Sequence, residues 1–96
     1  GRLLALDLRT RKVQPVTKAT VGNLDGLELD GKGGFLVTDW VEGAVLHISA
    51  RGAATSVLDL PKGSADIAYL SRKKLLIVPQ MLENKVTAYD LSGVIK

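Results

Sequence analysis

The chain has 96 residues, of which 46% are hydrophobic, carries a formal net charge of +3 and contains no cysteine. This composition is typical of a globular fold, and it excludes a disordered tail, a disulfide scaffold and thiolate chemistry. No apolar run approaches the roughly 20 residues needed to span a bilayer, so we expect a soluble protein with no membrane partner. No signal-peptide pattern is present, and the sequence leaves the compartment open.

Short apolar runs separated by turn residues recur about every 8–12 residues, and a helical period is absent. This pattern predicts an all-β fold. The expected strands cover nine segments, at 3–8, 13–17, 24–29, 35–39, 44–48, 55–58, 67–70, 75–79 and 86–91.

The turns between these strands have a chemical basis. Residues 30–34 (Asp-Gly-Lys-Gly-Gly) tolerate positive φ, as a tight hairpin needs, whereas 71–74 (Ser-Arg-Lys-Lys) must form the equivalent hairpin without glycine. Glu42-Gly43 and Glu83-Asn84 make the next turn in each case. In both turns the second residue, glycine or asparagine, tolerates the left-handed conformation.

The segment 25–52 recurs at 66–93, 41 residues later and without a gap. The positions that are identical in the two copies include Asp25 and Asp66, Leu29 and Leu70, Val37 and Val78, Glu42 and Glu83, Val45 and Val86, and Gly52 and Gly93. A period near 40 with strand-like content predicts β-propeller blades, each a four-stranded antiparallel sheet.

With the strands of a blade lettered A to D from the channel outward, residues 1–20 supply strands C and D, 21–60 a complete blade, and 61–96 strands A, B and C. The chain therefore holds about two and a quarter blades, whereas closed propellers typically have four to eight. We expect the remaining blades to come from a longer parent chain. The alternative is assembly of several copies, such as a homotrimer of an engineered or minimal piece. The mass of the intact chain and its oligomeric state decide between them.

The stretch DGLELDGKGGFLVTDWVEGAVLHISARG at 25–52 resembles the blade signature of the six-bladed gluconolactonase and regucalcin (senescence marker protein) family. It also resembles the NHL repeat, in which apolar-Asp-x-x-Gly is followed by an apolar triplet, Asp, and Gly-x-Val. In lactonase-like relatives an Asp before Gly at the start of an A strand binds a catalytic divalent cation, usually calcium. The resemblance implies that role for Asp25 in Leu24-Asp25-Gly26-Leu27. Asp66 occupies the equivalent place, where relatives often carry Asn, and the family's other ligands come from other blades.

Strand order assigns the loops to two faces. Residues 18–25, 38–44, 60–66 and 79–85 belong to the face that relatives use for ligands, here called the mouth face, and the other turns belong to the opposite, far face. The mouth face has a net charge of −2 and the far face +6. An acidic mouth attracts cations and repels phosphates, so we expect a divalent cation and no nucleic acid there.

Calcium prefers carboxylate and amide oxygens. Asp25 and Asp66 are the candidate ligands, supported by Asn23 or Gln80. The alternative is that aspartates at strand starts cap backbone amides and are otherwise solvated.

Trp40, the only tryptophan, either lines a ligand pocket or covers blade packing, and its repeat equivalent Met81 favours packing. His47 and Ser49 lie on one face of a strand, but no orienting acid or oxyanion hole is evident, so we interpret His47 as a satisfied or exposed histidine. The basic run 72–74 is interpreted as a solvated hairpin tip.

Three functions follow. The first is a fragment of a calcium-dependent hydrolase acting on a lactone or ester, in which Asp25 holds the metal and Trp40 and the loop 79–85 shape specificity. This fragment alone is expected to be inactive. The second is an NHL-type binding module without catalysis, and the third is an engineered or minimal propeller piece that assembles into a ring.

Overall fold

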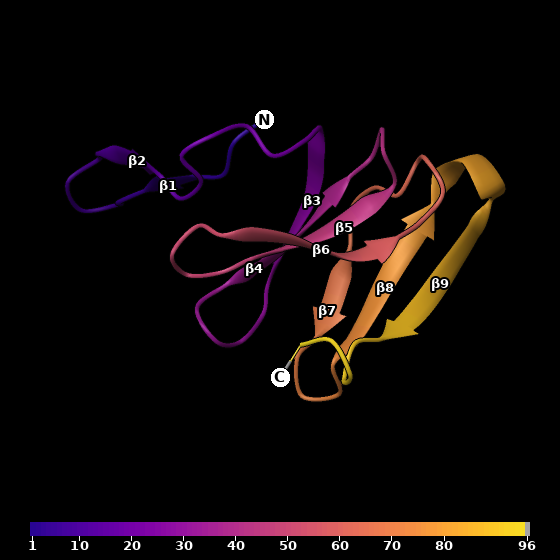
Figure 1. Cartoon of the computed structure of the whole chain (residues 1–96). Coiled ribbons are helices and arrows are strands. Elements are labelled where there is room, and N and C mark those ends of the chain that lie inside the picture. The colour runs from indigo at the N-terminus through magenta and orange to yellow at the C-terminus, as the bar shows by residue number, and fades with distance from the viewer. Residues whose placement is uncertain (96) are drawn as a thin grey trace.

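The computed structural model describes residues 1–95, which form nine strands and a single turn of 3₁₀ helix (Figure 1). The strands are β1 (Leu4–Leu6), β2 (Val13–Pro15), β3 (Leu24–Leu29), β4 (Phe35–Asp39), β5 (Ala44–Ile48), β6 (Ala54–Asp59), β7 (Ala68–Leu70), β8 (Leu75–Gln80) and β9 (Lys85–Asp90). Each predicted strand is confirmed, with bounds that differ by at most two residues. The 3₁₀ turn η1 (Met81–Glu83) was not predicted and lies between β8 and β9.

The strands pair in chain order into three antiparallel sheets. The first sheet is β1-β2, the central sheet β3-β4-β5-β6 and the last sheet β7-β8-β9. This is the predicted grouping of two, four and three strands, and it confirms the all-β fold class. Within residues 1–95 no helix is long and apolar enough to cross a membrane.

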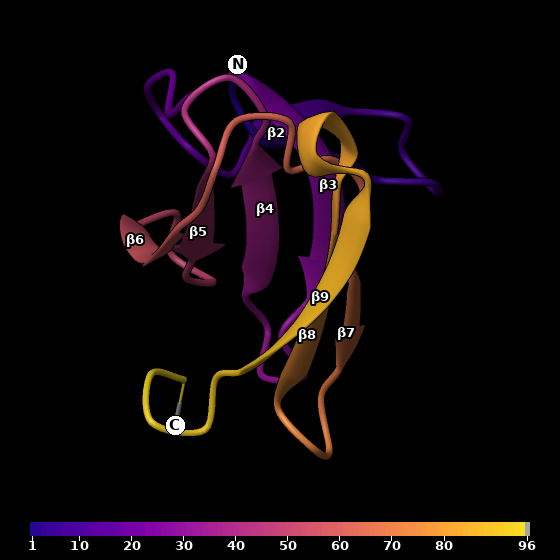
Figure 2. The ribbon, with the colours of Figure 1, turned by 90° about the vertical axis from the view of Figure 1, so that its right-hand side faces the viewer.

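The hydrophobic core lies between the central and the last sheet, which stand side by side in Figure 2. Leu36 of β4 and Val45 of β5 meet Leu76 and Val78 of β8, and all four side chains are fully buried. Successive residues of a strand point to opposite faces, so Leu76 and Val78 of β8 both reach this core. Ile67, Leu91 and Ile95 complete it.

The first sheet projects away from the other two as a hairpin (Figure 1). All residues of its strands are exposed, among them the apolar Leu4, Leu6 and Val13. The hairpin is closed at its base, where the backbone N–H of Leu3 donates to the buried Thr17 Oγ1 at 3.0 Å. The hairpin therefore keeps its strand pairing while leaving apolar side chains uncovered in this chain.

The loops of the mouth face lie along one edge of the two larger sheets. The β4–β5 loop, residues 60–66 and η1 all lie at the top in Figure 1, while the β3–β4 and β7–β8 turns lie at the bottom. The predicted turns have the expected backbone, because Gly43 and Asn84 both adopt positive φ. In the glycine-free hairpin Lys74 takes the positive φ instead.

Candidate functional site

The loops of the mouth face are joined by backbone hydrogen bonds that run across both sheets. The N–H of Trp40 donates to the carbonyl of Asn23 at 3.1 Å, and the Trp40 carbonyl accepts from Gly63 at 2.8 Å. The carbonyl of Gly63 in turn accepts from Met81 at 3.1 Å. The loops before β3, after β4, before β7 and after β8 thus form one connected unit. Asn23, Trp40 and Met81, which the sequence assigned to the mouth, belong to this unit.

Thr38 fastens the two sheets together beneath these loops. Its fully buried hydroxyl accepts from the Gly26 N–H at 2.8 Å and donates to the Ala65 carbonyl at 2.7 Å. Gly26 permits this approach because a Cβ at that position would lie 2.8 Å from the Cα of Asp66. The start of β3 and the segment before β7 are therefore in direct backbone contact.

The two candidate metal ligands flank this contact. Asp25 precedes Gly26 and is exposed, and no hydrogen bond or ion pair engages its carboxylate within the described chain. Asp66 is also exposed, and its Oδ1 accepts only from the adjacent Ile67 N–H, at 3.0 Å. The described residues contain no group of three or more histidines and carboxylates placed to hold a metal. Calcium takes six to eight oxygens, so the donors within residues 1–95 do not complete a calcium site.

The two supporting donors have different surroundings. Gln80 is 1% exposed, and its amide lies between two side chains of β9. Its Nε2 donates to the Tyr89 hydroxyl at 3.0 Å, and its Oε1 accepts from Thr87 at 2.7 Å. Asn23 is exposed, and its backbone carbonyl accepts from Trp40. The Gln80 amide is therefore committed to the last sheet, whereas the Asn23 side chain is open to solvent.

The mouth face presents large apolar side chains. Trp40 is 43% exposed, Val41 38%, Met81 58% and Leu82 68%. The loop that carries Trp40 is held by Asp39, which is buried and accepts from the Val41 and Glu42 N–H groups at 3.1 and 3.0 Å. Trp40 and Met81 occupy equivalent positions in the repeat, and both side chains lie largely outside the core.

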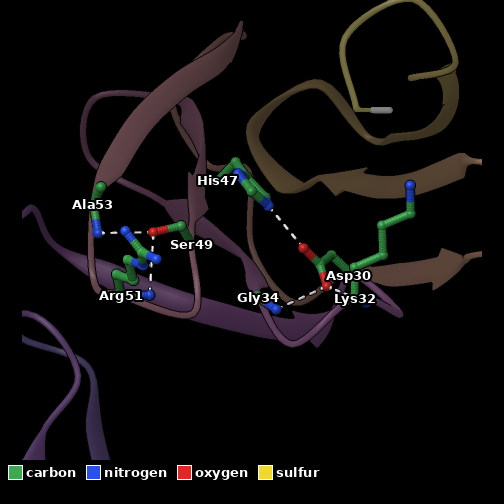
Figure 3. A network of polar contacts seen from close by, with 7 residues as sticks. All are labelled: Asp30, Lys32, Gly34, His47, Ser49, Arg51 and Ala53. Carbon is green, nitrogen blue, oxygen red and sulfur yellow. Dashed lines mark hydrogen bonds and ion pairs between the residues drawn. The ribbon is translucent and has the colours of Figure 1, made fainter.

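A carboxylate–histidine pair lies at the opposite end of the central sheet (Figure 3). Asp30 Oδ2 is 2.8 Å from His47 Nε2, while Asp30 Oδ1 accepts from the N–H groups of Lys32 at 2.6 Å and Gly34 at 2.9 Å. Burial alone would raise the pKa of Asp30. The His47 hydrogen bond, the two backbone amides and the charge of His47 outweigh burial and hold the pKa below its usual value of 3.8. Asp30 is therefore an ionised acceptor with both oxygens engaged.

The pair depends on the strand register and on one missing side chain. Glu28 and Leu36 face each other across β3 and β4, and Leu36 faces His47 across β4 and β5. Asp30 lies two residues after Glu28, and Gly34 lies two residues before Leu36. Both positions are therefore on the same face of the sheet as His47. A Cβ at Gly34 would lie 2.5 Å from Asp30 Oδ2 and 3.1 Å from His47 Nε2. The glycine therefore leaves the space in which the carboxylate reaches the imidazole.

The sequence indicated a satisfied or exposed histidine without an orienting acid. The structure shows a satisfied histidine and supplies the acid in Asp30. The register of β3, β4 and β5, together with the glycine at position 34, could have predicted the Asp30–His47 pair. Ser49 does not extend the pair into a nucleophilic triad. Its Oγ accepts from the Arg51 and Ala53 N–H groups at 3.3 and 3.2 Å, as Figure 3 shows, so it closes the β5–β6 turn.

Comparisons of the chain with protein-family models, with curated proteins and with solved structures found no match.

Proposed function

We propose that this chain is a segment of a β-propeller whose mouth face binds a partner protein, as in an NHL-type binding module without catalysis. The observation that carries the proposal is the exposure of Trp40 and Met81 on loops that are hydrogen-bonded to each other through Gly63. Exposed apolar side chains on mobile loops would lose conformational entropy on binding. Side chains on loops that are joined by hydrogen bonds lose less conformational entropy on binding. Burying these side chains therefore contributes more to the affinity.

The residue types also suit binding. Tryptophan is enriched among the residues that dominate interface energetics, and methionine adapts its shape to a partner surface. Trp40, Val41, Met81 and Leu82 supply apolar contacts on two neighbouring loops. We infer that these residues form the centre of the contact.

The charge of the mouth face indicates the chemistry of the partner. Glu42 and Glu83 follow the apolar residues in the two loops, and Asp25 and Asp66 lie at the adjacent strand starts. Among the described residues, Glu83 is the one of these four carboxylates that forms an ion pair, with Lys85 at 3.4 Å. Both side chains are exposed, where such a pair contributes little. The partner that fits is a peptide segment with apolar side chains flanked by lysine or arginine.

Tryptophan fluorescence tests this proposal directly, because the chain has a single tryptophan and it lies in the proposed contact. A short synthetic peptide of alternating lysine and leucine is titrated into the protein, and a peptide of alternating glutamate and leucine is the control. We expect the basic peptide to shift the Trp40 emission to shorter wavelength and to bind at least about tenfold more tightly. Met81→Ala should weaken the binding of the basic peptide severalfold. Equal binding of both peptides, or no change in emission, contradicts the proposal.

A lactonase-like, calcium-dependent hydrolase is the second candidate. It is favoured by the contact between Gly26 and Asp66, which brings the strand starts carrying Asp25 and Asp66 together. Since the described residues offer too few ligands, the metal would need donors from further blades, either of a parent chain or of other copies. Calcium titration of such a closed ring should raise its melting temperature, and Asp25→Ala should abolish the gain. No gain in the unmodified ring contradicts the hydrolase.

A further inference from the structure

The Asp30–His47 pair lies in the wall of a cavity at the end of the central sheet that carries the far-face turns. The cavity has a volume of about 560 Å³, within the range of roughly 300–1,000 Å³ typical of small-molecule sites. Besides the pair, its wall includes Thr55 and Val57 of β6 and Val94 and Ile95 of the turn after β9. The mouth face contributes no residue to this cavity, so it is separate from the proposed partner contact.

The hydrogen bonds of Asp30 fix which ring nitrogen of His47 carries the proton. An ionised carboxylate only accepts hydrogen bonds, so Nε2 of His47 must be the N–H donor to Asp30 Oδ2. In the neutral ring the lone pair then lies on Nδ1. The described residues give Nδ1 no hydrogen-bond partner, and the His47 side chain is 26% exposed. His47 lines the cavity, so in its neutral form it offers an oriented acceptor there.

We propose that this cavity binds a small neutral alcohol or phenol, whose hydroxyl donates to His47 Nδ1 and whose apolar body lies against Val57, Val94 and Ile95. The apolar part of the wall favours a hydrocarbon or ring. The oriented acceptor selects a ligand with a hydroxyl donor over one of equal shape without it. Asp30 acts as a positioning residue, because it fixes the imidazole and does not touch the ligand.

Phenol and its methyl ether, anisole, form a matched pair of probes, because anisole keeps the ring and lacks the donor. Titrations are followed by the amide shifts of the ¹⁵N-labelled protein, and long-range ¹H–¹⁵N correlations report the His47 tautomer. We expect Nε2–H in the free protein, phenol-induced shifts around His47 and Ile95, and anisole binding at least about tenfold weaker. His47→Leu should abolish the difference, whereas Trp40→Leu on the mouth face should preserve it.

Asp30→Asn provides a second test that keeps the shape of the site. The Lys32 and Gly34 N–H groups require the amide oxygen at the Oδ1 position, so the NH₂ group must face His47. It donates to Nε2 and moves the ring proton to Nδ1. The tautomer should therefore switch, and the preference for phenol over anisole should fall severalfold. Equal binding of the two probes by the unmodified protein, a preference for phenol that persists in His47→Leu, or an unswitched tautomer in Asp30→Asn would overturn the proposal.

Discussion

Thr38→Val tests whether one buried hydroxyl holds the two larger sheets together. Valine keeps the size and β-branching of threonine, so the substitution removes only the hydrogen bonds to Gly26 and Ala65. An unpaired buried N–H or C=O costs about 1–3 kcal/mol. With two groups left without partners, we expect a loss of about 2–6 kcal/mol in the free energy of unfolding. At about 4–8 °C per kcal/mol for a domain of this size, even the lower value decreases the melting temperature by roughly 8–16 °C.

The assay is denaturant and thermal unfolding followed by circular dichroism, with Thr38→Ser as the control. Serine keeps both hydrogen bonds and loses one methyl group, at a cost of about 0.8 kcal/mol. The expected order of stability is wild type, then Thr38→Ser, then Thr38→Val. Hydrogen exchange of the Gly26 amide should accelerate in Thr38→Val alone. A valine variant as stable as the serine variant would refute the role of the hydroxyl.

Three further predictions concern the polar groups of the core and the far face. Gly34→Ala places a methyl group 2.5 Å from Asp30 Oδ2 and should cost about 1–3 kcal/mol in thermal unfolding, whereas Gly93→Ala, which meets nothing within 4 Å, should be neutral. The lowered pKa of Asp30 gives stability that is present above its ordinary value of 3.8 and lost as the pH falls through its folded pKa. Asp30→Asn should therefore flatten the pH dependence of unfolding below about pH 4, and an unchanged slope would contradict this. Gln80→Leu strands the Thr87 and Tyr89 hydroxyls and should cost about 1–2 kcal/mol, more than Tyr89→Phe, while an inverse order would show that the amide is dispensable.

The strands were predictable because two local signals agreed along the chain. Short apolar runs mark strands such as β8, and turn residues such as Gly43 and Asn84 mark the hairpins between them. The repeat then gave the grouping into sheets, because equivalent segments must pair alike. The 3₁₀ turn at Met81–Glu83 was missed, because a single turn has no periodicity to detect.

The site was less predictable, because its contacts join residues distant in sequence. The loop hydrogen bonds through Gly63 use backbone atoms, which carry no residue signature. The second copy lacks the Asp30–His47 pair, because serine and alanine occupy the equivalent positions. The repeat therefore gave no indication of the pair. The engagement of Gln80 by Tyr89 likewise required the register of β8 and β9.

If the mouth-face loops form the binding face of this chain, a bound peptide changes the amide shifts of these loops. The ¹⁵N-labelled protein is therefore titrated with the lysine–leucine peptide, and the shifted amides are mapped onto the sequence. We expect perturbed amides in residues 38–44, 60–66 and 79–85, with the Trp40 indole N–H among the largest changes. Perturbations confined to the far-face turns at 30–34, 49–53 and 71–74 would show that the mouth-face loops are not the binding face.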